Sequence, residues 1–184
     1  MFQPFPQRFS LARRTPLPCR QRGREQRQGG GECADEAWPV TRRGATRIIP
    51  VLTRRSVVDR ANVARLTLIA RGAAEQCERL SVPDLAEAQP LHRVLDGWDG
   101  TPLVLAQERG AASALRDAVA KLSSPLALLV GPEGGFETAE LDDLRRRAFV
   151  VPAALGPRIL RAETAAVAGL AAVQALVGDW AERA

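Results

Sequence analysis

At 184 residues and 46% hydrophobic content, the chain has the size of one ordinary domain plus an extension, and it has enough apolar side chains for a core. Its net charge of +5 suggests a nucleic-acid partner, but residues 1–43 hold nine Arg and four acidic residues and supply all of that charge. Residues 44–184 hold seventeen basic and seventeen acidic residues. This balance excludes a global positive field over the body of the protein, so any RNA-binding surface there is a local patch.

Cysteine and histidine are too few and too scattered for several kinds of site. Cys19, Cys33 and Cys77 show no paired spacing, and their odd number argues against a disulfide framework and for a reducing, cytoplasmic compartment. His92 is the single His and has no recognisable Ser partner, so we expect neither a metal site nor a Ser-His-Asp site. No apolar run reaches the length of a membrane span, and we expect no membrane association.

Residues 1–43 do not have the pattern of a folded segment. Arg, Pro, Gln and Gly dominate, and no apolar period persists. Two interpretations remain open, a disordered basic tail and a wrong-frame or wrong-start translation. We favour the second, because 25 Arg against one Lys indicates a GC-rich gene, and misread GC-rich DNA yields this mixture of residues.

Strand and helix patterns alternate along the rest of the chain. Residues 126–130 form a short unbroken apolar run, typical of a strand buried on both faces of a parallel sheet. Residues 162–177 are apolar almost all round, which predicts a helix buried on several sides. The expected strands are 46–52, 102–106, 126–130 and 149–151, and the expected helical segments are 62–77, 91–95, 111–122, 137–148 and 162–177. The alternation predicts an α/β fold with a mostly parallel sheet.

Two Gly- and Pro-containing loops follow apolar runs near the C-terminal end. The first is GPEGGF at 131–136, and the second begins LGPRILRAETA at 155–165. The first loop is not a P-loop, because no Gly-Lys-Ser/Thr follows, and by itself it also fits a plain tight turn. Ligands of parallel sheets bind beyond the carboxyl ends of the strands, so the two loops together predict a pocket lined by backbone.

These two motifs, in this order, resemble the paired signature of the ribosomal RNA uridine-N3 methyltransferases that act on the small subunit. The family belongs to the SPOUT superfamily of knotted α/β methyltransferases. The match begins near Gly44 with GATRIIPVLTRRSV, continues with AAEQCERLSVPDL and runs to residue 179, about three quarters of the chain. The resemblance implies a C-terminal trefoil knot, S-adenosyl-L-methionine as cofactor, and methylation of N3 of a specific uridine in 16S ribosomal RNA.

The resemblance also assigns cofactor-binding residues to both loops. Leu155, Gly156, Ile159 and Leu160 are expected to line the adenosyl site, with Ile159 and Leu160 on either side of the adenine. The expected cofactor-binding residues of the first loop are Val130, Gly131, Glu133 and Gly135.

The reaction requires help with a proton, because the uracil N3–H is protonated at neutral pH and is a poor nucleophile. Arg158 and Arg161 are our candidates for stabilising uracil carbonyl oxygens or an RNA phosphate. Glu163 is a candidate general base, and equally a partner that fixes an Arg. Structural readings stay open, since Arg158 and Glu163 also suit a surface ion pair. No metal is expected, because the sulfonium is already activated.

Outside the loops, Arg54 and Arg55 are candidate RNA-binding residues, or else solvated surface charges. Arg145, Arg146 and Arg147 are read as a favourable helix end. Glu137 stands where the family usually has a Ser cap, so the capping box at this helix start is expected to be incomplete.

The resemblance divides the chain into residues 1–43, where the family's PUA-like RNA-binding barrel is not visible, and a SPOUT methyltransferase domain at 44–184. It also implies 16S ribosomal RNA or the small ribosomal subunit as partner, and a homodimer to which the last helix contributes. Two alternatives remain open: a catalytically inactive RNA-binding or assembly module of the same fold, and a truncated, non-functional gene product.

Overall fold

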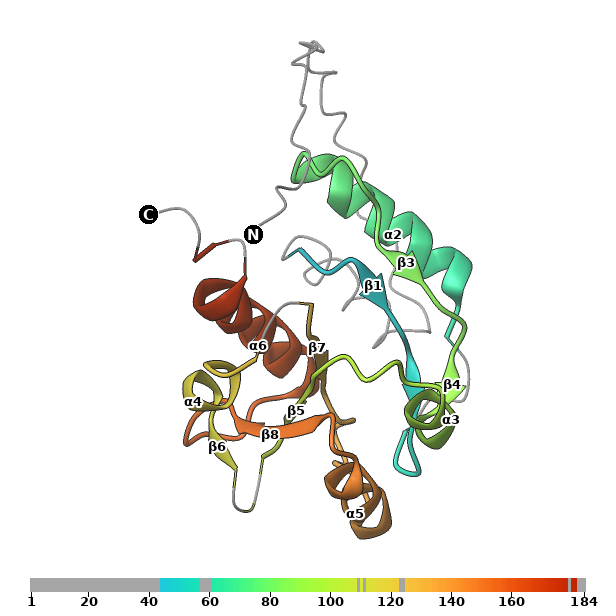
Figure 1. Ribbon diagram of the computed structural model, residues 1–184. Helices are drawn as coiled ribbons and strands as arrows, with labels where there is room; N and C mark the ends of the chain where they lie inside the picture. Colours follow the sequence, from blue (N-terminus) through green and yellow to red (C-terminus); the bar gives the residue numbers. More distant parts are fainter. Residues whose placement is uncertain are drawn as a thin grey trace.

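The computed structural model of the protein describes residues 44–56, 61–108, 110, 112–122, 125–178 and 180–181 (Figure 1). Our interpretation of residues 1–43 lies outside these described residues.

A four-stranded parallel sheet forms the centre of the fold. Its strands are β5 (Leu103–Ala106), β6 (Ser113–Ala114), β7 (Ala127–Leu129) and β8 (Val150–Ala154). The spatial order is β6-β8-β5-β7, and all three pairs are parallel. The predicted parallel α/β architecture is therefore confirmed. Strand β8, the last strand among the described residues, lies inside the sheet between β5 and β6.

Strand β8 continues past the end that we predicted, because Pro152 is accommodated within it. The Phe149 carbonyl accepts a hydrogen bond from the Leu103 N–H of β5 at 2.8 Å, and the Ala153 carbonyl accepts one from the N–H of Gln107, the residue after β5, at 2.9 Å. The backbone N–H and C=O groups of successive residues point to alternate sides of a strand, so the backbone nitrogen of Pro152 faces β6. Among the described residues, β6 pairs only with Ala153 and Ala154 of β8. The missing N–H of Pro152 thus interrupts no hydrogen bond between the strands.

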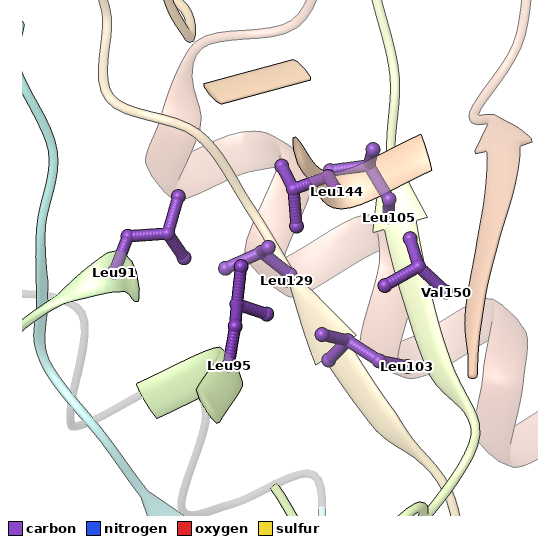
Figure 2. Close-up of a cluster of buried hydrophobic side chains, with 7 residues drawn as sticks. All are labelled: Leu91, Leu95, Leu103, Leu105, Leu129, Leu144 and Val150. Carbon is purple, nitrogen blue, oxygen red and sulfur yellow. The ribbon is translucent and has the colours of Figure 1, made fainter. Parts of the chain in front are cut away.

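The two faces of the sheet carry separate apolar clusters. Leu103 and Leu105 of β5 point to one face and Val104 to the other, as strand geometry requires. Figure 2 shows the first cluster, in which helices α3 (Leu91–Asp96) and α5 (Thr138–Arg146) cover the sheet. Its buried members are Leu91, Leu95, Leu103, Leu105, Leu129, Leu144 and Val150.

Helices α4 (Leu115–Val119) and α6 (Ala162–Val177) cover the opposite face, as Figure 1 shows. Val104, Leu115, Val119, Ala153 and Val173 are the buried members of this second cluster. The chain therefore folds as three layers, with helices on both sides of a parallel sheet.

Helix α6 is buried along one stripe only. Ala165, Gly169 and Val173 are buried at helical spacing, whereas Leu176 is 39% exposed. A Cβ atom at Gly169 would lie 2.8 Å from a methyl carbon of Leu128, so the helix approaches β7 closely. The expected burial on several sides is not found in the single chain, because one small sheet covers only one side of the helix.

Two short parallel ladders and helix α2 (Val63–Gln76) lie beside the sheet. Strand β1 (Arg47–Ile48) pairs with β3 (Asp84–Leu85), and β2 (Val51–Leu52) pairs with β4 (Gln89–Pro90). We predicted one strand over 46–52, which is wrong in detail. The register shifts by one residue between the ladders, from 84 − 47 = 37 to 89 − 51 = 38, and Pro50 between them cannot donate a hydrogen bond.

The helix predicted over 111–122 is also shorter than expected. Ser113 and Ala114 pair with the end of β8 as strand β6, and only Leu115–Val119 is helical. These residues pair with the edge of β8 that β5 leaves free, although their local pattern suits a helix. Residue 111 lies outside the described residues.

Helix α5 begins and ends with charged side chains that make specific contacts. Contrary to our expectation, a capping box is formed by Glu137 and Glu140, in which Glu140 Oε2 accepts from the Glu137 N–H at 3.0 Å. At the other end, Arg147 donates to Asp96 of α3 at 2.6 Å and to Asp143 at 3.3 Å. These hydrogen bonds raise the pKa of Arg147 and join α5 to α3.

No described helix is both long enough and apolar enough to cross a lipid bilayer.

Replacing Leu144 tests the core beneath α5. This side chain is fully buried, so Leu144→Ala is expected to lower the free energy of unfolding by about 2–5 kcal/mol. The measurement is a urea unfolding curve. Leu68→Ala is the matched control, because Leu68 is 67% exposed on α2, and it should change stability by less than about 0.5 kcal/mol. Equal losses in both variants would contradict this description of the core.

Candidate functional site

The carboxyl ends of three parallel strands lie at one edge of the sheet. Strand β5 leads into Gln107 and Glu108, β7 into the loop at 130–136, and β8 into the loop at 155–161. These segments enclose a cavity of about 300 Å³. The two Gly- and Pro-containing loops therefore form the walls of one cavity, as the sequence predicts.

The first loop is a tight turn closed over its own aromatic side chain. The Gly135 N–H donates to the Pro132 carbonyl at 2.8 Å. A Cβ atom at Gly131 would lie 2.8 Å from a ring carbon of Phe136, so a larger residue would displace the ring. Phe136 itself lines the cavity and supplies an apolar surface there.

The second loop turns sharply at Gly156 and ends at the start of α6. Gly156 has a φ of +124°, and Gly135 in the first loop has a φ of +67°; both values favour glycine strongly. Arg161 is the N-cap of α6, and its carbonyl accepts from the Ala165 N–H at 2.8 Å. The backbone of this loop is thus constrained at both ends.

Most of the sequence-predicted site residues line this cavity. From the expected cofactor set these are Val130, Gly131, Glu133, Gly135, Leu155, Gly156 and Leu160, joined by Arg158 from the catalytic set and Arg55 from the RNA-binding set.

Four predicted residues do not line the cavity: Arg54, Ile159, Arg161 and Glu163. Ile159 is 61% exposed, and Arg161 and Glu163 are exposed beside the second loop. Among the described residues, no ion pair joins Glu163 to either arginine of its motif, so the surface-pair reading has no support here. Glu163 lies in the first turn of α6, where a carboxylate also interacts favourably with the helix dipole.

Arg54 belongs to a short turn at the mouth of the cavity, residues 53–56, which we call the arginine loop. The Arg54 N–H donates to Glu140 Oε1 at 2.9 Å, and its Nε lies 3.7 Å from Glu137 Oε2. Arg55 Nη1 donates to the Gly134 carbonyl at 2.9 Å. Arg54 therefore contacts the start of α5 and Arg55 contacts the GPEGGF loop, so neither is an isolated surface charge.

Sequence reasoning missed several lining residues, of which Gln107 is the most informative. Gln107 is 8% exposed and is the buried polar residue of the described chain. Its N–H donates to the Ala153 carbonyl at 2.9 Å, which places it directly after β5. The rule that sites lie beyond strand ends, applied to β5, identifies it together with Glu108. The other missed lining residues are Ala106, Gly134, Phe136, Leu141, Ala162 and Ala165.

The described residues contain no group of three or more His, Cys, Asp or Glu side chains with a metal-binding arrangement.

The fold and the cavity together define an α/β protein with a cavity at the carboxyl edge of a parallel sheet, where proteins of this class bind their ligands. Residues 39–174 match the family model described as RNA methyltransferase domain, and the chain belongs to this family.

Individual relatives agree with this assignment. The chain is 36% identical over 144 residues to the ribosomal RNA small subunit methyltransferase E of Rickettsia conorii, covering 78% of this chain and 59% of that protein. It is also 36% identical over 146 residues to the enzyme of the same name from Bacillus subtilis, covering 72% and 57%. The chain thus spans little more than half the length of these curated relatives.

A solved structure supports the similarity in three dimensions. The ribosomal RNA small subunit methyltransferase E of Neisseria gonorrhoeae, bound to S-adenosyl methionine, superposes with a TM-score of 0.71 at 30% sequence identity. The superposition covers 83% of this chain and 64% of that one.

A glycine exchange tests the shape of the second loop. Gly156→Ala is expected to lower the free energy of unfolding by about 1–3 kcal/mol, because alanine strongly disfavours a φ of +124°. Thermal or urea unfolding measures the loss. Gly97→Ala is the matched control: Gly97 has a φ of −93°, and its added Cβ would make only an ordinary contact with the Arg93 carbonyl. A Gly156→Ala variant as stable as Gly97→Ala would refute the left-handed turn.

Proposed function

We propose that the protein is an S-adenosyl-L-methionine-dependent methyltransferase that modifies N3 of a uridine in 16S ribosomal RNA, acting in the cytoplasm on RNA or on the small ribosomal subunit. The observation that supports this most is the single cavity formed by both motif loops at the carboxyl edge of the sheet. Family membership and the names of the relatives supply the substrate class.

The lining of the cavity fits this cofactor. Its volume of about 300 Å³ lies at the lower end of the range for small-molecule sites. Phe136, Leu155 and Leu160 offer apolar contact for an adenine ring, while the glycines expose backbone N–H and C=O groups. Glu108 and Glu133 are acidic groups in the lining, suited to a ligand with positive charge. When bound, S-adenosyl-L-methionine would supply an activated methyl group on a sulfonium.

The chain's own residues then have to bind uracil, remove the proton from its N3 and stabilise the resulting negative charge. Arg158 lines the cavity, so we propose that its guanidinium stabilises the carbonyl oxygens of the uracil as negative charge develops. Arg161 and Glu163 lie just outside the lining, where Arg161 suits an RNA phosphate and Glu163 suits proton removal from N3.

Recognition of RNA is assigned to the arginine loop. Arg54 has a side chain that is 71% exposed at the cavity mouth, next to the lining residue Arg55. Residues 44–184 are electrically neutral overall, so such a local cluster is what this part of the chain offers to phosphates.

We further propose that the chain forms the trefoil knot of the SPOUT superfamily, with 44–184 as the methyltransferase domain. The support is the resemblance of the motifs, together with the path of the chain. Strand β8 enters the sheet between β5 and β6, and α6 then returns to pack against Leu128 of β7.

A homodimer through α6 belongs to the same proposal. An apolar groove lies between α4 and α6, and α6 lacks a partner on that side within the described chain. The residues that line the groove are Leu115, Arg116, Ala154, Leu155, Ala168, Ala172 and Leu176. Leu155 lines both the groove and the cavity, so a partner seated here would contact the wall of the cofactor site.

Substitution of Leu160 tests the cofactor site. Leu160→Asp places a charge without a partner against the adenine, so affinity for S-adenosylhomocysteine should fall at least about tenfold in calorimetric titration. Methyl transfer to small subunits that lack the modification should fall with it. The control Leu68→Asp, on exposed α2, should bind normally. Normal binding by Leu160→Asp would refute the assignment. The same exchange at Ile159 tests the adenine sandwich.

Light scattering tests the dimer at micromolar concentration. The unsubstituted chain should have twice the mass of one chain, and Leu176→Asp should be monomeric, because the charge would be buried in the interface. Leu80→Asp is the control, since Leu80 is 80% exposed and outside the groove. A monomeric unsubstituted chain would contradict the proposal.

A further inference from the structure

We infer that Glu140 is a positioning residue for methyl transfer, because its carboxylate holds the arginine loop at the mouth of the cavity. The role of the arginine loop in RNA recognition rests on the proposed function. The contacts of Glu140 are independent of the proposed function, since they are internal to the protein.

Both oxygens of the Glu140 carboxylate accept backbone hydrogen bonds. Oε1 accepts from the Arg54 N–H at 2.9 Å and Oε2 from the Glu137 N–H at 3.0 Å. Arg54 and Glu140 are 86 residues apart in the sequence. The half-buried side chain of Glu140 therefore joins the arginine loop to the first turn of α5, because its carboxylate accepts one charge-assisted hydrogen bond from each.

The arginine loop is a compact turn, so its fixation at Arg54 also positions its other residues. The Thr53 N–H donates to Ser56 Oγ at 2.9 Å, and the Ser56 N–H donates back to the Thr53 carbonyl at 3.2 Å. The next residue, Arg55, reaches the Gly134 carbonyl at 2.9 Å and lines the cavity. Glu140 thus orients Arg55 through the backbone of the loop.

The other contacts of the loop with α5 are weaker. Arg54 Nε lies 3.7 Å from Glu137, and the Arg54 side chain is 71% exposed. Exposed ion pairs at such a distance contribute little to a fixed geometry. The bond from the Arg54 backbone to Glu140 is therefore the main restraint that α5 applies to the loop, and it leaves the Arg54 guanidinium available for a phosphate.

Glu140→Gln is the informative variant. Glutamine keeps the size of the side chain but has one acceptor oxygen, and its NH2 group faces an N–H donor. One of the two backbone bonds must be lost. Asp142→Asn is the matched control, because Asp142 lies on the same helix and, among the residues that the structure describes, forms an ion pair only with Arg145, at 3.8 Å.

The test uses the full chain and two kinds of measurement. Amide exchange of residues 53–56 should become about tenfold faster in Glu140→Gln and stay unchanged in Asp142→Asn. With small ribosomal subunits that lack the modification, KM for the subunit should rise about tenfold in Glu140→Gln. Affinity for S-adenosylhomocysteine should change less than about threefold, because most of the cavity wall is untouched.

A substitution cycle separates positioning from general loosening. In a background with both Arg54→Ala and Arg55→Ala, Glu140→Gln should change KM by less than about twofold, because both guanidinium groups of the arginine loop are absent. Unchanged amide exchange, equal acceleration in Asp142→Asn, or the full KM effect in the background that lacks both arginines would each overturn the inference. If the unsubstituted chain neither bound S-adenosylhomocysteine nor methylated subunits, the proposed function would fail. The amide exchange would then decide the role of Glu140 by itself.

Discussion

The parallel pairing of β5 with both β7 and β8 is the constraint on which the site depends. The register pairs Leu105 with Leu129 on one side and with Pro152 on the other, so the three strands end at the same edge. Apolar clusters on both faces hold the strands in this arrangement. Antiparallel pairing would place the two motif loops at opposite edges of the sheet, and no common cavity would form.

A second set of contacts brings a distant segment to this edge. The arginine loop precedes the sheet in the chain, yet it reaches the first turn of α5 through Glu140 and the GPEGGF loop through Arg55. Residues 44–184 have no net charge, so attraction to RNA depends on where individual cations are held. Under the proposed function, these two arginines beside the cavity are the local cations that would meet RNA phosphates.

The elements and loops with strong local patterns were predictable. Residues 126–130 formed an unbroken apolar run, and the strand β7 lies within it. Several positions in the two loops have a positive φ or no space for a Cβ atom, and only glycine suits them. The glycines in the sequence therefore predict tight turns there. Weaker local patterns were misleading: residues 113–114 have a helical pattern but pair with β8, and the strand predicted at 46–52 is divided near Pro50.

The sequence by itself determined the α/β class, the two motif loops and the family to which they belong, because these follow from periodicity and from glycine and proline at defined positions. Only the tertiary structure decided which side chains meet. Leu160 lines the cavity whereas its neighbour Ile159 is exposed, and Gln107 enters the lining without any motif. Glu140 contacts Arg54 across 86 residues of chain. Such contacts depend on sheet order and on the packing of helices against it, which local sequence patterns do not encode.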